Sequence, residues 1–286
     1  MNIQPDTTAS ELPTWEALAR MDDDALPLLG TALLIARDEY PELQPAHYDA
    51  VVQGYADTLR AEVQAQDAAP ARMAVINRYL FDELGFGGNN DAYSDPRNSY
   101  LNDVFDRKLG IPISLAVVQM EIARRLDVPL DGISFPGHFL VRLPVDDGIL
   151  VMDPYNRGRS LSADELRDRV SVHFGGQTPD DAELLHILAP ATHRTILLRM
   201  LRNLKALYVD QDDWERVARS ADRLLKLAPG LGEEIRDRGL AYLKLGHLTG
   251  AREDLARYLA VQPEAPDVEA IHALLVDATG MSQRLN

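Results

Sequence analysis

The chain of 286 residues contains no cysteine, and this absence excludes disulfides, thiolate metal sites and a cysteine nucleophile. Long apolar runs are also missing, since the longest, residues 26–36 and 113–120, are shorter than the roughly 20 residues that cross a bilayer. The seven histidines include no HxxxH pair. We therefore expect a cytoplasmic protein with no membrane span, no metal site and no cofactor.

The sequence also has fewer basic than acidic residues. The sequence has 29 Lys and Arg residues against 45 Asp and Glu residues, a net charge of -16. This balance disfavours a nucleic acid or an anionic membrane as the main partner, because both are themselves negative. The remaining composition, 46% hydrophobic and 26% charged, is typical of a globular protein, and the length allows two domains.

The hydrophobic pattern divides the chain into three parts. Residues 1–13 lack apolar periodicity and predict a flexible tail. Residues 14–191 predict an α+β domain, largely helical around a small antiparallel sheet, because helical spacing gives way to short apolar segments between turn residues. The expected helices are 25–39, 46–65, 70–84, 99–109 and 112–126, and the expected strands are 133–135, 138–143 and 149–152.

The last two expected strands form a hairpin if the chain turns at Asp146 and Asp147. A two-residue turn there pairs residues whose numbers sum to 293. Side chains alternate along a strand with period two, so His138 and Asp153 then share a face as diagonal neighbours. The hairpin therefore predicts contact between the imidazole and the carboxylate.

An internal repeat of 34 residues marks the C-terminal part. Tyr208 matches Tyr242 at this spacing, and Pro229 matches Pro263. A helix-turn-helix period of 34 residues resembles the tetratricopeptide repeat. Residues 192–286 are therefore expected to form a repeat module of helix pairs, closed by a capping helix near 267–278.

Three segments of the first domain, GIPISLA, FPGHFLVR and ILVMDPYN, resemble the transglutaminase-like, papain-related core, in which a helix, a His strand and an Asp strand follow one another. FDELGFGGN and DPRNSYLNDV bring the resemblance closer to the SirB-type proteins. These are bacterial proteins with a transglutaminase-like domain followed by tetratricopeptide repeats. The resemblance implies this fold and domain order, but no known reaction.

The resemblance places His138 and Asp153 at the family's catalytic positions, whereas its cysteine has no counterpart. Ser114 is the hydroxyl nearest to the start of the expected helix 112–126. One hypothesis is a pseudoenzyme, in which Ser114 bonds to backbone and His138 pairs with Asp153 to shape a pocket. The alternative is a serine-dependent amide hydrolase or acyltransferase, in which His138 deprotonates Ser114 beside an oxyanion hole.

A dense polar segment precedes the expected helix 99–109. Either it caps that helix, or its side chains line the same pocket as His138, since polar loops beside a buried helix often do. The candidate pocket-lining residues are Asp95, Arg97, Asn98, Tyr100 and Asn102.

The repeat module offers a second kind of site, because the first helix of each unit faces the groove of a tetratricopeptide stack. The basic residues on these helices are Arg199, Arg202, Lys205 and Arg236. They form either a strip that binds a protein or an acidic peptide, or ordinary solvated helix faces. We interpret the whole chain as a protein-interaction or regulatory factor with a transglutaminase-like core that lacks its nucleophile, and whether it retains any enzymatic activity is left open.

Overall fold

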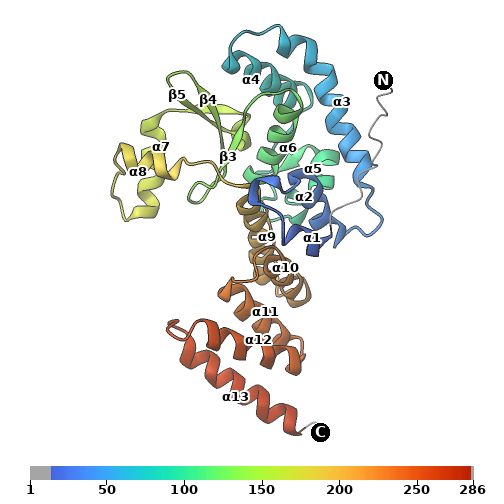
Figure 1. Ribbon diagram of the computed structural model, residues 1–286, viewed down its shortest axis with the longest axis vertical. Helices are drawn as coiled ribbons and strands as arrows, with labels where there is room; N and C mark the ends of the chain where they lie inside the picture. The colour runs from blue at the N-terminus through green and yellow to red at the C-terminus, as the bar shows by residue number, and fades with distance from the viewer. Residues whose placement is uncertain (1–13, 285–286) are drawn as a thin grey trace. The chain divides into compact units, whose positions relative to one another are not determined.

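The computed structural model describes residues 14–284, which form two compact units (Figure 1). The first unit runs from Asp22 to Leu197, and the second comprises Thr14–Met21 together with the chain from Leu198 onward. The tail predicted over residues 1–13 lies outside the described residues. Within those residues, no helix is both long and apolar enough to cross a membrane.

The first unit is α+β, as the sequence predicted. Its main helices are α2 (Leu28–Arg37), α3 (Pro45–Gln64), α4 (Ala69–Asn77), α5 (Leu101–Arg107), α6 (Pro112–Arg125), α7 (Ala163–Ser171) and α8 (Asp181–Ile187). A π-helical turn over Arg78–Glu83 extends α4, and short 3-10 turns lie at Asp23–Ala25, Pro96–Asn98, Pro154–Asn156 and Val172–Phe174. The predicted helices therefore formed, and α7 and α8 are additional to them.

Helix α6 is the central element of this unit. Every residue from Pro112 to Ala123 is buried, because α6 contacts α2, α3, α4 and α5 as well as strands β3 (Asp131–Ile133) and β4 (Leu140–Val145) (Figure 1). Pro112 occupies the first turn, where its missing N–H would have had no intrahelical partner. The apolar sequence of α6 thus fixes the centre of the unit.

A four-stranded antiparallel sheet in the order β3-β4-β5-β6 packs beside α6. Its strands are β3 (Asp131–Ile133), β4 (Leu140–Val145), β5 (Gly148–Asp153) and β6 (Arg159–Leu161). A second, two-stranded parallel sheet joins β1 (Gly87–Gly88) to β2 (Leu109–Gly110). The sequence predicted only a turn at 85–88, and the pairing depends on residues 22 positions further along the chain.

The hairpin register is confirmed. Val141 pairs with Met152 and Val145 with Gly148, so the paired numbers sum to 293. The strand limits shift, however: the N–H of Phe135 donates to the carbonyl of Ile133 at 2.9 Å, and this tight turn ends β3 two residues early. The N–H of His138 likewise bonds to the carbonyl of Phe135, so His138 lies in a turn just before β4.

The second unit contains the repeat helices. They are α9 (His193–Asp210), which crosses from the first unit, α10 (Trp214–Leu227), α11 (Gly232–Lys244), α12 (Leu248–Val261) and α13 (Val268–Arg284). Position 239 favours glycine, because a Cβ there would lie only 2.9 Å from Cδ2 of Leu255. Ala251 and Tyr258 of α12 are buried as well, so side chains of the repeat pack between its helices.

A short N-terminal helix, α1 (Trp15–Leu18), belongs to this second unit. Trp15 is buried, and the Arg223 guanidinium lies 5.1 Å from its ring centroid. The sequence placed residues 14–191 in one domain, whereas by contacts residues 14–21 join the repeats and the first unit continues to Leu197. An aromatic side chain packed against a distant helix gives no local signal in the sequence.

Candidate functional site

His138 and Asp153 form a hydrogen-bonded pair, as the hairpin parity predicted. The Nε2 atom of His138 lies 2.8 Å from the Oδ1 atom of Asp153. Since a charged carboxylate only accepts, Nε2 carries the proton in this bond. The Asp153 side chain is fully buried, whereas that of His138 is 22% exposed. The pair therefore presents one partly accessible imidazole, held from behind by a buried carboxylate.

Four donors meet at the Asp153 carboxylate. Besides His138, the Tyr155 N–H reaches Oδ1 at 3.1 Å, while Asn156 Nδ2 and an Arg169 guanidinium nitrogen reach Oδ2 at 2.7 and 3.2 Å. Burial by itself raises the pKa of Asp153, but the bonds from His138, Asn156 and Arg169 outweigh it and lower the pKa to about 2. Asp153 is therefore charged throughout the physiological range.

This shift predicts a pH-dependent stability. Because the folded pKa of about 2 lies below the ordinary 3.8, the ionised carboxylate contributes roughly 2 kcal/mol of stability at neutral pH, present above pH ~5 and lost as the pH falls toward ~2. Urea unfolding of the parent protein and of Asp153→Asn should therefore differ at pH 7, and the difference should shrink as the pH falls toward 2. The exposed turn variant Asp146→Asn is the control, and a gap that stays constant with pH would contradict this assignment.

Two tyrosines lie one after the other beside His138. The Tyr155 ring lies edge-on to the imidazole, with 6.2 Å between centroids, and the Tyr93 ring meets Tyr155 in the same way at 6.0 Å. Tyr155 also donates to Asn90 Oδ1 at 2.9 Å. Its ring lies directly over Gly88, where any Cβ would collide with it. The β1 segment and the turn after β5 thus together form one wall beside His138.

Gly137 precedes His138 in the turn before β4. Its φ is +66°, a left-handed conformation that favours glycine. The His173 ring packs against it so closely that a Cβ would lie 2.6 Å from Nε2 of His173. Two features therefore favour glycine at position 137: the left-handed turn that precedes His138, and the close approach of the His173 ring.

The Ser114 hydroxyl is used by the helix start. It donates to the Asn98 carbonyl at 2.6 Å and accepts from the Ile111 N–H at 3.0 Å, and the residue is fully buried. Ser114 occupies the third position of α6 and returns to the N–H of the residue that precedes the helix. A hydroxyl in this role satisfies backbone groups at the helix terminus.

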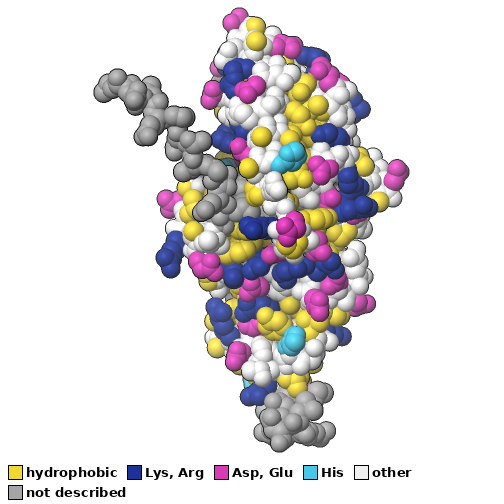
Figure 2. Space-filling view, turned by 90° about the vertical axis from the view of Figure 1, so that its right-hand side faces the viewer, with side chains coloured by type: hydrophobic (Ala, Val, Ile, Leu, Met, Phe, Trp, Pro, Cys, Tyr) yellow, Lys and Arg dark blue, Asp and Glu magenta, His cyan; other side chains and the backbone are white. Residues whose placement is uncertain are grey.

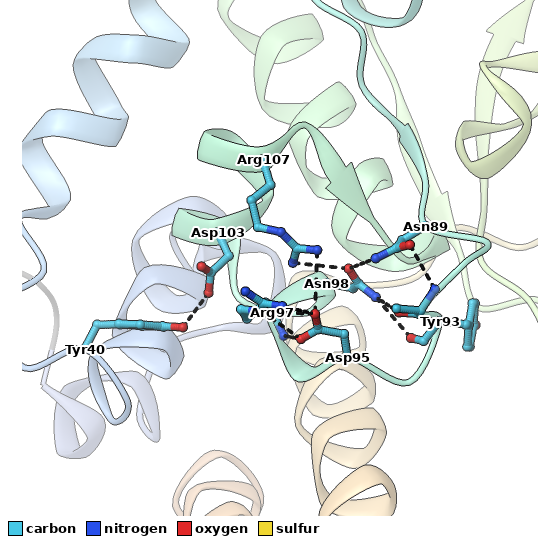
Figure 3. Close-up of polar contacts among 9 residues, drawn as sticks. Tyr40, Asn89, Tyr93, Asp95, Arg97, Asn98, Asp103 and Arg107 are labelled. Atoms are coloured by element: carbon cyan, nitrogen blue, oxygen red, sulfur yellow. Dashed lines mark hydrogen bonds and ion pairs between the residues drawn. The ribbon is translucent and has the colours of Figure 1, made fainter.

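The polar segment 95–102 is mostly structural (Figure 3). Asp95 caps the 3-10 turn and binds Arg97 at 2.7 Å, with Arg107 3.6 Å away. The buried Asn98 amide donates to the carbonyls of Ala92 and Tyr93 and accepts from Asn89 (Figure 3). Asn98 therefore ties this loop to α6, and it is linked to the His138 surroundings through Tyr93.

The other two predicted pocket-lining residues lie elsewhere. Tyr100 is buried, edge-on to Tyr40. Asn102 lines a separate hollow with residues 39–44 and Tyr48. Beside it, Tyr40 donates to Asp103 at 2.7 Å (Figure 3). Burial and this carboxylate raise the pKa of Tyr40 well above its usual range. Helix capping and packing thus account for most of the polar segment.

The predicted basic strip of the repeat unit is matched by acidic residues one repeat along. Arg202 binds Glu234 at 3.1 Å, and Lys205 binds both Glu234 and Asp237. Arg236, equivalent to Arg202, binds Asp267 at 2.8 Å. Arg199 is half-buried in α9, the helix that also carries Arg202 and Lys205. Basic and acidic side chains are likewise interspersed over the face shown in Figure 2.

Sequence reasoning missed three residues around the pair. Tyr155 and Asn156 lie two and three residues after Asp153, so the segment DPYN could have indicated that they contact its carboxylate. Arg169 comes from α7, which no pattern connected to the hairpin.

Comparisons with known proteins agree with this architecture. A family model described as the transglutaminase-like superfamily matches residues 46–202, and one described as the tetratricopeptide repeat matches residues 204–276. A UPF0162 protein of Xylella fastidiosa is 61% identical over 93% of this chain and 95% of its own length. Protein SirB1 of Salmonella typhimurium is 30% identical over 68% of this chain and 71% of its own length. F-box only protein 21 of Mus musculus shares 30% identity over 60% of this chain and 28% of its own.

The fold, the His–Asp pair and these matches define a transglutaminase-like protein with an appended tetratricopeptide unit. Within that class, the chain belongs to the UPF0162 family of SirB-type proteins. The resemblance in the sequence is thereby confirmed.

Proposed function

We propose that this protein is a cytoplasmic interaction factor whose transglutaminase-like unit is a pseudoenzyme. One observation carries the proposal: the Ser114 hydroxyl, the hydroxyl that the sequence offered in place of the missing cysteine, is buried and bonded to the backbone of Asn98 and Ile111. A serine nucleophile must lose its proton to a histidine in the transition state. The Ser114 hydroxyl instead donates a hydrogen bond to the carbonyl of Asn98.

The His138–Asp153 pair is explained without a reaction. Asp153 joins the end of β5, the turn after it and α7 through its four donors. A buried carboxylate with this many partners stabilises a fold whether or not its histidine does chemistry. The pair then shapes a surface, walled by Tyr155 and Tyr93, on which a partner can rest.

The repeat unit supports the interaction role, because tetratricopeptide stacks present extended concave binding surfaces. An acidic partner peptide competes with Asp237 for Lys205 and with Asp237 and Asp267 for Arg236, and both aspartates are only partly buried. Glu234, with a side chain 1% exposed, stays in place as the internal counter-charge. The proposed partner is therefore a protein segment with carboxylates spaced to match one repeat.

The pseudoenzyme proposal predicts no turnover that depends on His138. Activated esters and glutamine–amine pairs should react at the same rate with the parent protein and with His138→Ala. A fluorophosphonate should leave the intact mass unchanged. Stoichiometric labelling that disappears in Ser114→Ala would instead establish the serine-dependent hydrolase or acyltransferase, with Ser114 released from Asn98 as nucleophile.

A further inference from the structure

A pocket lies at the C-terminal end of α6, away from the His138–Asp153 pair. Two adjoining hollows of about 500 and 240 Å³ share Leu28, Glu121, Arg124 and His193 in their walls. All of their lining residues belong to the first unit. Glu121 is nine residues from Pro112, which places it roughly 14 Å along the helix axis from the end of α6 that carries Ser114.

The walls of this pocket are largely apolar. Pro27, Leu28, Leu29 and Leu33 contribute from α2 and the residue before it, and Pro45 contributes from the start of α3. Apolar walls with a few converging polar groups are typical of small-molecule sites. The polar groups therefore decide what the pocket accepts.

Glu121 supplies the first polar group. The residue is 4% exposed, and Oε2 accepts two bonds from Arg124, at 3.2 and 2.9 Å. Within residues 14–284, its other oxygen, Oε1, accepts no hydrogen bond from the protein. This oxygen is also not among the fully buried polar atoms that lack a partner, so it is accessible. One carboxylate oxygen on a buried side chain is thus open to the pocket.

His193 supplies the second. Its Nδ1 lies 2.7 Å from the carbonyl of Leu26. A carbonyl only accepts hydrogen bonds, so Nδ1 carries the proton, and Nε2 of the neutral ring is an acceptor. Both hollows include His193. The pocket thus combines two acceptors with apolar walls.

The charges that line the pocket favour a cation. Its acidic residues are Asp24, Asp49, Glu121 and Asp131, against the single arginine Arg124. Asp49 is ion-paired with Arg125 and Asp131 lies 3.9 Å from Arg142, so Asp24 and Glu121 supply the negative charge that a cation would meet. Arg124 has a side chain 62% exposed, so a bound cation can share the Glu121 carboxylate with it from the inner side.

From this arrangement we infer that the pocket binds a primary ammonium group carried on a short apolar chain. The ammonium has three N–H donors, which suit Glu121 Oε1, His193 Nε2 and one water. The alkyl chain lies against Leu28, Leu29 and Leu33. The same chemistry is offered by a free aliphatic amine and by a lysine side chain of a partner protein.

Titration calorimetry of the full-length protein tests this inference with n-pentylamine and with Nα-acetyl-lysine methylamide. Saturable binding of either compound is the expected result, and binding of only one identifies its source as a free amine or a protein lysine. Pentan-1-ol and the Nε-acetylated lysine derivative, which keep the chain and lose the charge, should bind at least roughly tenfold more weakly.

Two variants localise the site. Glu121→Gln keeps the shape and should weaken amine binding at least roughly tenfold. Ala25→Lys places a competing ammonium at the exposed rim without altering the core and should do the same, while Ala61→Lys, on the exposed face of α3, is the matched control. Absence of saturable amine binding, or equal affinity in the parent, Glu121→Gln and Ala25→Lys, would overturn the inference.

Discussion

Replacement of Asp153 by alanine is expected to destabilise the first unit by about 3 kcal/mol. The carboxylate is fully buried and accepts from His138, Asn156, Arg169 and the Tyr155 N–H. Alanine removes the acceptor and leaves a cavity in the protein beside donors that have lost their partner. Because the donors come from the turn before β4, the turn after β5 and α7, one substitution loosens three segments.

The position of this effect can be measured as well as its size. Amide hydrogen exchange should accelerate in β5 and α7 of Asp153→Ala. Asp153→Asn keeps one acceptor oxygen and should lose less stability, and His138→Ala, which removes one partly exposed partner, least of all. Equal losses in Asp153→Ala and His138→Ala would show that the carboxylate serves only its histidine, as a purely catalytic residue would.

Replacement of Glu234 by alanine is expected to destabilise the second unit by about 2 to 3 kcal/mol. Glu234 is 1% exposed and binds both Arg202 and Lys205 of the preceding repeat. The Lys205 side chain is only 13% exposed, so the loss of Glu234 leaves a largely buried ammonium with Asp237 as its remaining acidic partner among the described residues. Ion pairs this deep are little screened, so the effect should persist in high salt.

Tryptophan fluorescence isolates this unit, because both tryptophans, Trp15 and Trp214, lie in it. The urea midpoint from fluorescence should fall for Glu234→Ala and stay nearly constant for Glu233→Ala, whose side chain is exposed on the same turn. A double variant, Glu234→Leu with Lys205→Met, should recover part of the loss, since an apolar pair replaces a buried ion pair at little net cost. If Glu234→Ala matches Glu233→Ala, the ion pairs between repeats contribute nothing to stability.

Much of the fold could be predicted because its signals are local. Helix spacing and prolines located α3 and α6, and the period of two along a strand placed His138 beside Asp153 once the turn at Asp146 and Asp147 was assumed. The 34-residue period marked the repeat helices, since Gly239 and Tyr258 are required wherever two such helices pack. Steric alternation and helix periodicity act within a few residues, and a sequence displays them directly.

Contacts between distant segments decided the rest. Ser114 is a candidate nucleophile by type and position, but the carbonyl that accepts its hydrogen bond belongs to Asn98, 16 residues earlier. In the sequence, Arg202 is a candidate for an unpaired cation in the groove, but in the structure it is paired with Glu234, 32 residues later. The pocket at the end of α6 brings together Leu28, Glu121 and His193, which no single pattern connects. The order of residue types fixes which side chains are available. Tertiary packing decides which of their polar atoms already have partners, because those partners come from segments far apart in the chain.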